Sequence, residues 1–138
     1  MKSDLERFLK AQERDYATAL NEIKNGRKTS HWIWYIFPQI SGLGFSSTSK
    51  YYSIKDRNEA IEYLNNKTLK NRLIEICEAL LCLDNNDATY IMGYPDDLKL
   101  KSSMTLFNEV SDIDIFKKVL DKFYNGEKDE MTISLLNK

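Results

Sequence analysis

Ten residues, Ser30 to Gln39, constrain the fold of this chain more than any other stretch. They read Ser-His-Trp-Ile-Trp-Tyr-Ile-Phe-Pro-Gln and hold both tryptophans and the only histidine of the 138 residues. Seven consecutive positions, 31–37, carry five aromatic rings, which must be covered because exposed aromatic clusters associate in water. Polar side chains flank these rings. Such a composition fits either a core element with polar ends or the apolar wall of a ligand pocket.

The residue pattern alone leaves two structures open for this block, a short helix and a buried strand. Ser30 is a suitable N-cap, and Pro38 would end a helix at Phe37. Because helical spacing dominates the rest of the chain, a lone strand would have no pairing partner. We therefore expect a helix, followed by a loop over 39–45 whose two glycines permit tight turns.

Helical periodicity runs through the remaining sequence. The clearest helix covers 5–23, where apolar residues recur every three or four positions after a capping-box pattern at Ser3 and Glu6. Asn25-Gly26 supplies its stop signal. Asp56, Asp87 and Asp129 are further N-cap candidates. The sequence predicts a compact all-α fold of seven or eight helices, with one domain over residues 1–138.

Overall composition argues against several classes of function. Twenty basic and twenty-one acidic residues leave a formal charge of −1, so no global basic field favours nucleic acid or an anionic membrane surface. The N-terminal segment is charged, which is not typical of a signal peptide. The longest apolar run, 32–37, is too short to span a bilayer. We expect a cytoplasmic protein that does not enter the membrane.

The cysteines and the single histidine do not form a metal-binding pattern. Cys77 and Cys82 lie five positions apart on one expected helix, which does not place them face to face, and we expect two buried, reduced thiols. One histidine with two such cysteines cannot build a structural zinc site. We expect no metal, and the sequence identifies no cofactor.

Two residues are candidates for catalysis, His31 and Asp96. His31 is the one side chain with an ordinary pKa near neutrality, so it could exchange protons or bind a phosphate, or simply satisfy a structural hydrogen bond. Asp96 and Asp97 follow Pro95, where they suit a helix N-cap and first turn. Neighbouring helical residues point about 100° apart, so one functional aspartate is more credible than two acting on one bond.

Hydroxyls and lysines in the second half of the chain could form an anion-binding rim beside the aromatic block. This combination suits a small anionic or nucleotide-like ligand, with NAD and ADP-ribose as examples, held between the motifs 30–39 and 95–107. Both motifs carry more apolar bulk than a short helix can bury alone, so we expect them to meet. The expected ligand-binding residues are Ser30, His31, Trp34, Gln39, Ser46, Tyr52, Asp97, Lys99, Lys101, Ser102 and Ser103.

Three blocks together, 30–39, the segment 42–52 with its two glycines, and 95–107, resemble the bacterial family named domain of unknown function 1810 (DUF1810). The likeness extends from the first helix to the segment 132–136. The departures are mild: Ile33 and Tyr35 stand where Met and Phe are common in the family, and Lys101 where Arg is common. The resemblance implies a compact helical fold and no established activity, cofactor or catalytic residue.

Three functions remain open from the sequence. The first is a small-ligand site, with or without catalysis, and the second is a non-catalytic module that binds a protein partner through exposed aromatic residues. The third, nucleic-acid binding through basic residues near stacking rings, is disfavoured by the near-zero net charge. Oligomeric state is left open.

Overall fold

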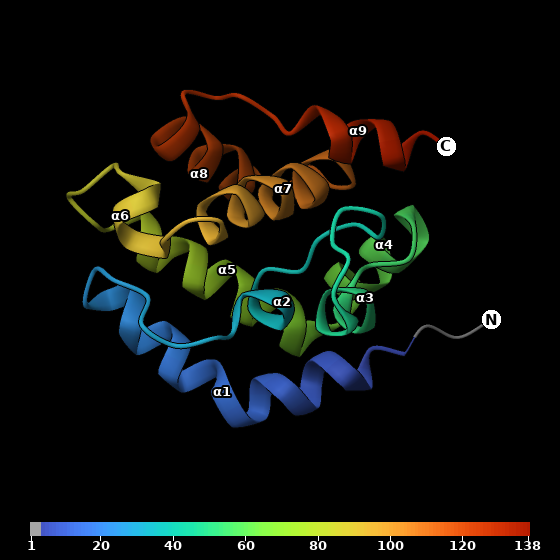
Figure 1. Ribbon diagram of the computed structural model, residues 1–138, viewed down its shortest axis with the longest axis horizontal. Helices are drawn as coiled ribbons and strands as arrows, with labels where there is room; N and C mark the ends of the chain where they lie inside the picture. The colour runs from blue at the N-terminus through green and yellow to red at the C-terminus, as the bar shows by residue number, and fades with distance from the viewer. Residues whose placement is uncertain (1–3) are drawn as a thin grey trace.

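The computed structural model describes residues 4–138, and this part of the chain is all-helical (Figure 1). The prediction of an all-α fold is confirmed, although the helices in this range number nine rather than seven or eight, and four of them are only one or two turns long. They are α1 (Glu6–Lys24), α2 (Ile33–Ile36), α3 (Ser47–Tyr52), α4 (Arg57–Asn65), α5 (Lys67–Leu81), α6 (Ala88–Met92), α7 (Asp96–Glu109), α8 (Asp114–Tyr124) and α9 (Glu130–Leu136).

Helix α5 lies at the centre of the arrangement. It packs against α1 on one side and α8 on the other, and α4 contacts it near its start (Figure 1). On the far side from α1, helix α7 packs against α8, α9 and α6. One continuous apolar core joins these helices, from Phe8 in α1 to Leu136 in α9. None of the helices within residues 4–138 has the length and apolar character needed to cross a membrane.

The aromatic block forms α2 and is almost wholly covered. Trp32, Tyr35 and Phe37 are buried, and Trp34 alone of these rings is partly exposed. Helix α2 contacts α7, so the two motifs meet as expected. The expected N-cap role of Ser30 is wrong: its hydroxyl donates to Glu22 Oε2 at 2.5 Å, because the chain brings it against α1 instead.

The segment after Pro38 closes on itself and presents α3 at the surface. A parallel bridge joins Ile40 to Ile54, with the Ile54 amide donating to Gln39 O at 2.8 Å. Within this closed loop, Ser46 caps α3 by accepting a hydrogen bond from the Ser49 amide at 3.0 Å. The loop is therefore fixed at its base and at its helical turn.

Local capping signals were reliable where the helix start is exposed. Asp56, Asp87 and Asp129 each accept a hydrogen bond from the amide three residues on, at 3.0, 3.2 and 3.3 Å. Asp96 is not the N-cap of α7; Pro95 holds that position, and the Asp96 carboxylate is drawn to Lys28 Nζ at 2.7 Å. The expected cap Ser3 lies outside the described residues.

The two cysteines differ in environment. Both are free, but only Cys77 is buried, 3.7 Å from Met104 Sδ, and burial raises the pKa of its thiol. Cys82 is exposed, which corrects the expectation of two buried thiols. It is the C-cap of α5, where the helix leaves the core.

Candidate ligand-binding site

Three cavities lie in a row along the loop 39–58. An enclosed cavity of about 20 Å³ is followed by open ones of about 430 Å³ and about 370 Å³. Ser41, Lys50 and Ser53 line both of the first two, and Lys55 lines both the second and the third. Because neighbouring cavities share residues, the three lie next to one another between α2 and α9.

Trp34 lines the small cavity and supplies its most informative group. Its Nε1 atom is buried and has no hydrogen-bond partner among residues 4–138. An indole N–H can only donate, and leaving a buried donor unpaired costs roughly 1–3 kcal/mol. A cavity of about 20 Å³ has room for one water-sized group. Because Nε1 itself has almost no surface accessible to a water-sized group, an acceptor oxygen in this cavity reaches it only after a small movement of the neighbouring side chains.

Polar groups surround this position. Gln39, Ser49 and Tyr52 line the same cavity, together with backbone at Gly42 and Gly44. Lys99, from α7, places its Nζ 5.3 Å from the centre of the Trp34 ring. A cation over an indole face is attracted by the ring quadrupole, so α7 supplies positive charge beside the aromatic wall.

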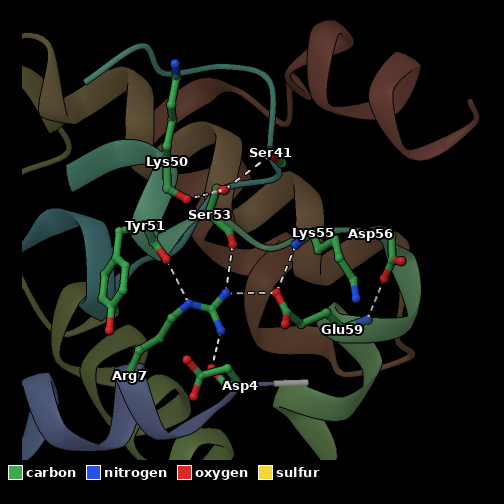
Figure 2. Close-up of polar contacts among 9 residues, drawn as sticks. All are labelled: Asp4, Arg7, Ser41, Lys50, Tyr51, Ser53, Lys55, Asp56 and Glu59. Atoms are coloured by element: carbon green, nitrogen blue, oxygen red, sulfur yellow. Dashed lines mark hydrogen bonds and ion pairs between the residues drawn. The ribbon is translucent and has the colours of Figure 1, made fainter. Parts of the chain in front are cut away.

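The floor of the second cavity is an arginine clamp (Figure 2). Arg7 donates from Nε to Tyr51 O at 2.8 Å, and from Nη2 to Ser53 O at 2.8 Å and to Glu59 Oε1 at 2.9 Å. Its Nη1 donates to Asp4 O. The Arg7 and Glu59 side chains are only 8% and 4% exposed. Since nearly all of its N–H donors are used within the protein, Arg7 shapes the cleft. The charge of a bound anion must therefore be met by other residues.

Glu59 completes this clamp from α4. Besides pairing with Arg7, it accepts a hydrogen bond from the Lys55 amide at 2.9 Å. The pair therefore holds both the end of α3 and the strand-like segment that follows it. Lys50 extends its side chain away from the clamp, at the upper rim in Figure 2. Lys50 and Lys55 have no carboxylate partner within the part of the chain that is described.

The sequence-predicted residues divide into two groups. Trp34, Gln39 and Tyr52 line the small cavity, and Lys99 lies against Trp34. Ser46 is close by, as the cap of α3. The structure brings these five together, so that the first motif contributes more to the site than the second.

The remaining α7 residues face other helices. Asp97 accepts from Thr89 Oγ1 at 2.6 Å, Ser102 donates to Asp129 Oδ2 at 2.9 Å, and Ser103 is fully buried. Lys101 lies 3.7 Å from a Glu127 carboxylate oxygen. None of these four lines the three cavities.

The two catalytic candidates also lie outside the row of cavities. His31 is exposed. Asp96 forms an ion pair with Lys28, and its carboxylate also lies 3.6 Å from Lys99 Nζ. The Asp96 carboxylate therefore has structural partners close to the aromatic block. Lys28 Nζ is also 4.9 Å from the centre of the Trp32 ring. This arrangement ties the start of α7 to the segment before α2.

Glu22 is a second structural anchor that the sequence did not single out. Its carboxylate accepts from the Thr29 and Ser30 amides at 2.8 and 2.9 Å and from Trp32 Nε1 at 2.9 Å. Burial alone would raise the pKa of Glu22, but these hydrogen bonds and that from Ser30 Oγ lower it to about 2. Trp32 is thus satisfied where Trp34 is not.

Several residues that line the cavities were not among the expected ligand-binding residues, including Arg7, Ser53, Lys55 and Glu59. Arg7 lies on the first helix among other charged residues, and nothing local distinguishes a buried arginine from a solvated one. For Glu59 the sequence contained a partial indication, because it lies three residues after the cap Asp56. An acidic side chain at this position is expected to accept a hydrogen bond from a backbone amide at the start of the helix. Glu59 does so, from the Lys55 amide.

The fold and the cavity row define a small all-α protein with a polar, cationic cleft beside a buried aromatic block. The chain belongs to the family described as protein of unknown function (DUF1810), whose model matches residues 2–136. It is similar to a solved structure, that of the conserved hypothetical protein Rv1873 from Mycobacterium tuberculosis, with 40% identity, a TM-score of 0.95 and coverage of 98% of this chain and 97% of that one. No curated protein matches it.

Proposed function

We propose that this protein binds a small anionic, nucleotide-like ligand in the row of cavities between α2, α3 and α4. One observation carries the proposal: Trp34, whose buried Nε1–H has no acceptor, lines a cavity sized for one oxygen. A donor held in this state is stabilised by any ligand oxygen that reaches it. Lys50 and Lys55 supply unpaired positive charge farther along the row, which favours an anionic ligand.

A thermal-shift screen with AMP, NAD, ADP-ribose and sugar phosphates tests the proposal, because a ligand that binds only the folded state raises the melting temperature. Trp34→Phe keeps an aromatic side chain, with a smaller ring, and removes the N–H donor. We expect this variant to fold and to bind a hit from the screen roughly tenfold more weakly, as is typical for one lost hydrogen bond. His31→Ala is the matched control, since His31 is exposed and lines none of the cavities.

Two outcomes would contradict the proposal. One is a screen in which no phosphate-bearing compound shifts the melting temperature. The other is a hit whose affinity is unchanged in Trp34→Phe, because the ligand would then bind elsewhere.

The alternative function, a non-catalytic protein–protein interaction module, is favoured by a different observation. Phe45 is 87% exposed and Tyr51 58% exposed, both in the segment that borders the cavities. Exposed aromatic side chains are common anchors of protein interfaces. A negative ligand screen would favour this function over the first.

A further inference from the structure

The second and third cavities meet at Lys55, which lines both. Their volumes, about 430 Å³ and about 370 Å³, each lie within the range typical of a small-molecule pocket. A mononucleotide needs only one such space. The two cavities together therefore offer room for a ligand with two units, one on each side of Lys55.

Positive charge follows the same row. Lys50 and Lys55 border the second cavity, and Lys55, Arg57 and Lys138 border the third. Of the acidic side chains there, Glu59 is paired with Arg7, Asp56 caps α4 at 3.0 Å from the Glu59 amide, and Asp4 is exposed at the edge of the second cavity. Five cationic side chains, those of Arg7, Lys50, Lys55, Arg57 and Lys138, therefore outnumber three acidic ones along the row. The third cavity has three cationic side chains and one carboxylate, in a chain whose formal charge is −1. The excess of positive charge is thus local to this row.

An aromatic face lies on one side of the junction only. Tyr51 lines the second cavity, is 58% exposed and meets the Tyr52 ring edge-on at 4.8 Å. An exposed ring held by a neighbouring ring is a suitable surface for stacking a nucleobase. The third cavity has no aromatic lining residue and is bordered instead by Leu135 and Leu136.

We infer that the ligand is a diphosphate that joins two units, as in ADP-ribose and dinucleotides, rather than a mononucleotide. The diphosphate lies at Lys55 between Lys50 and Arg57. The nucleoside unit stacks on Tyr51 in the second cavity, from which one of its hydroxyl oxygens extends past Ser41 and Ser53 into the small cavity at Trp34. The other unit enters the third cavity. This assignment rests on the proposed function and adds to it the class of ligand.

Isothermal titration calorimetry with AMP and ADP-ribose tests the assignment, using the full chain and the variants Lys55→Ala, Arg57→Ala and Lys138→Ala. We expect ADP-ribose to bind the parent at least tenfold more tightly than AMP, which corresponds to about 1.4 kcal/mol. Arg57→Ala and Lys138→Ala should each weaken ADP-ribose several-fold and leave AMP unchanged. Lys55→Ala should weaken both ligands, and Lys118→Ala, an exposed lysine on α8, should change neither.

The outcomes separate the two proposals. Equal affinity for AMP and ADP-ribose, or an equal loss of both in Arg57→Ala, would overturn the diphosphate assignment and leave the proposed function standing. Failure of both compounds to bind the parent would overturn both. Thermal melting of each variant identifies loss of folding, and the only described hydrogen bond of the Arg57 side chain, to Glu109 O, is long at 3.4 Å.

Discussion

Arg7 joins three separate pieces of backbone through one planar group. The guanidinium presents its donors in a rigid fork, and here they converge on Tyr51 O, Ser53 O and the Glu59 carboxylate. A lysine at this position would offer a single ammonium and could not reach all three acceptors in the same geometry. The floor of the second cavity therefore depends on Arg7, a side chain of the N-terminal helix α1.

Replacing this side chain tests that dependence. Arg7→Ala would leave Glu59, 4% exposed, as an uncompensated buried carboxylate, and we expect a loss of roughly 3–5 kcal/mol in the free energy of unfolding. Urea unfolding monitored by circular dichroism measures it. Arg14→Ala on the same helix is the control, because that side chain is 65% exposed and an ion pair in contact with solvent, such as that with Asp15, contributes little to stability. Similar losses in both variants would contradict the clamp.

Glu22 predicts a specific response to acid. Because its pKa is lowered from 4.5 to about 2 in the folded protein, its contribution to stability is complete above about pH 4.5 and is lost as the pH falls towards 2. We expect roughly 1–2 kcal/mol from this group, less than the full shift implies, since solvent screens part of the carboxylate. Unfolding free energies at pH 7 and pH 3 measure the loss.

The comparison variant is Glu22→Gln, which keeps the shape and removes the titrating group. Its stability at pH 7 should be lower than that of the parent, and it should lose less on acidification. An identical pH dependence in the two proteins would show that other carboxylates account for the acid sensitivity.

Among the elements, α9 is held to α7 by the residue that starts it. Asp129 accepts hydrogen bonds from the Thr132 amide and from Ser102 Oγ, and its own amide donates to Thr105 Oγ1 at 2.9 Å. One carboxylate thus caps a helix and joins it to its neighbour. Helix α9 in turn places Leu135 against Gly42 of the cavity loop.

Asp129→Ala should loosen this element without unfolding the rest. Loss of the cap and of the bond to Ser102 is expected to cost roughly 1–3 kcal/mol. Amide hydrogen exchange should accelerate over 130–136 and over the loop at Gly42, and remain slow in α5. Glu130→Ala, exposed in the same turn, is the control. Exchange that accelerates evenly through the molecule would contradict a local role.

The contrast among caps explains what sequence could predict. Asp56, Asp87 and Asp129 were identified correctly because a cap is satisfied within four residues, so local pattern contains the whole interaction. Ser30 and Asp96 had the same local pattern, yet they bond to Glu22 and Lys28. Both partners lie on other elements, Glu22 eight residues before Ser30 and Lys28 in the segment before α2, and no periodicity reveals them. Tertiary contacts, rather than local capping, therefore determine what the side chains of Ser30 and Asp96 bond to.

At the scale of the whole molecule, the apolar residues were enough to predict two features. Their spacing predicted the helical fold, and their bulk in the two motifs predicted that these motifs meet. The cavities could not be predicted in this way, because they are bounded by backbone of the loop 39–58 and by a clamp whose two halves are 52 residues apart. Of the residues around the small cavity, the sequence identified those in the aromatic block and at the end of α3. It did not assign the basic residues along the row to a ligand site, because local pattern does not show which charged side chains line a cavity.

The continuous core predicts a single cooperative unfolding transition for residues 1–138. Apolar contacts join α1 to α9 without a break, so no part of the described chain has a core of its own. Differential scanning calorimetry should give an unfolding enthalpy of about 95 kcal/mol near 60 °C, equal to the van't Hoff value. Two resolved transitions, or a calorimetric enthalpy well above the van't Hoff value, would contradict the one-domain prediction.

Gly44 bears on how freely this sequence can vary. A Cβ built at this position would lie 2.5 Å from the Ser49 Cβ, which real structures do not allow. Ser49 cannot withdraw alone, because its amide is held by the Ser46 cap and it belongs to α3. Even alanine would therefore displace a helix that lines two cavities. In a library randomised at this codon and selected for binding, the surviving clones should carry glycine, whereas the exposed Phe45 beside it should drift.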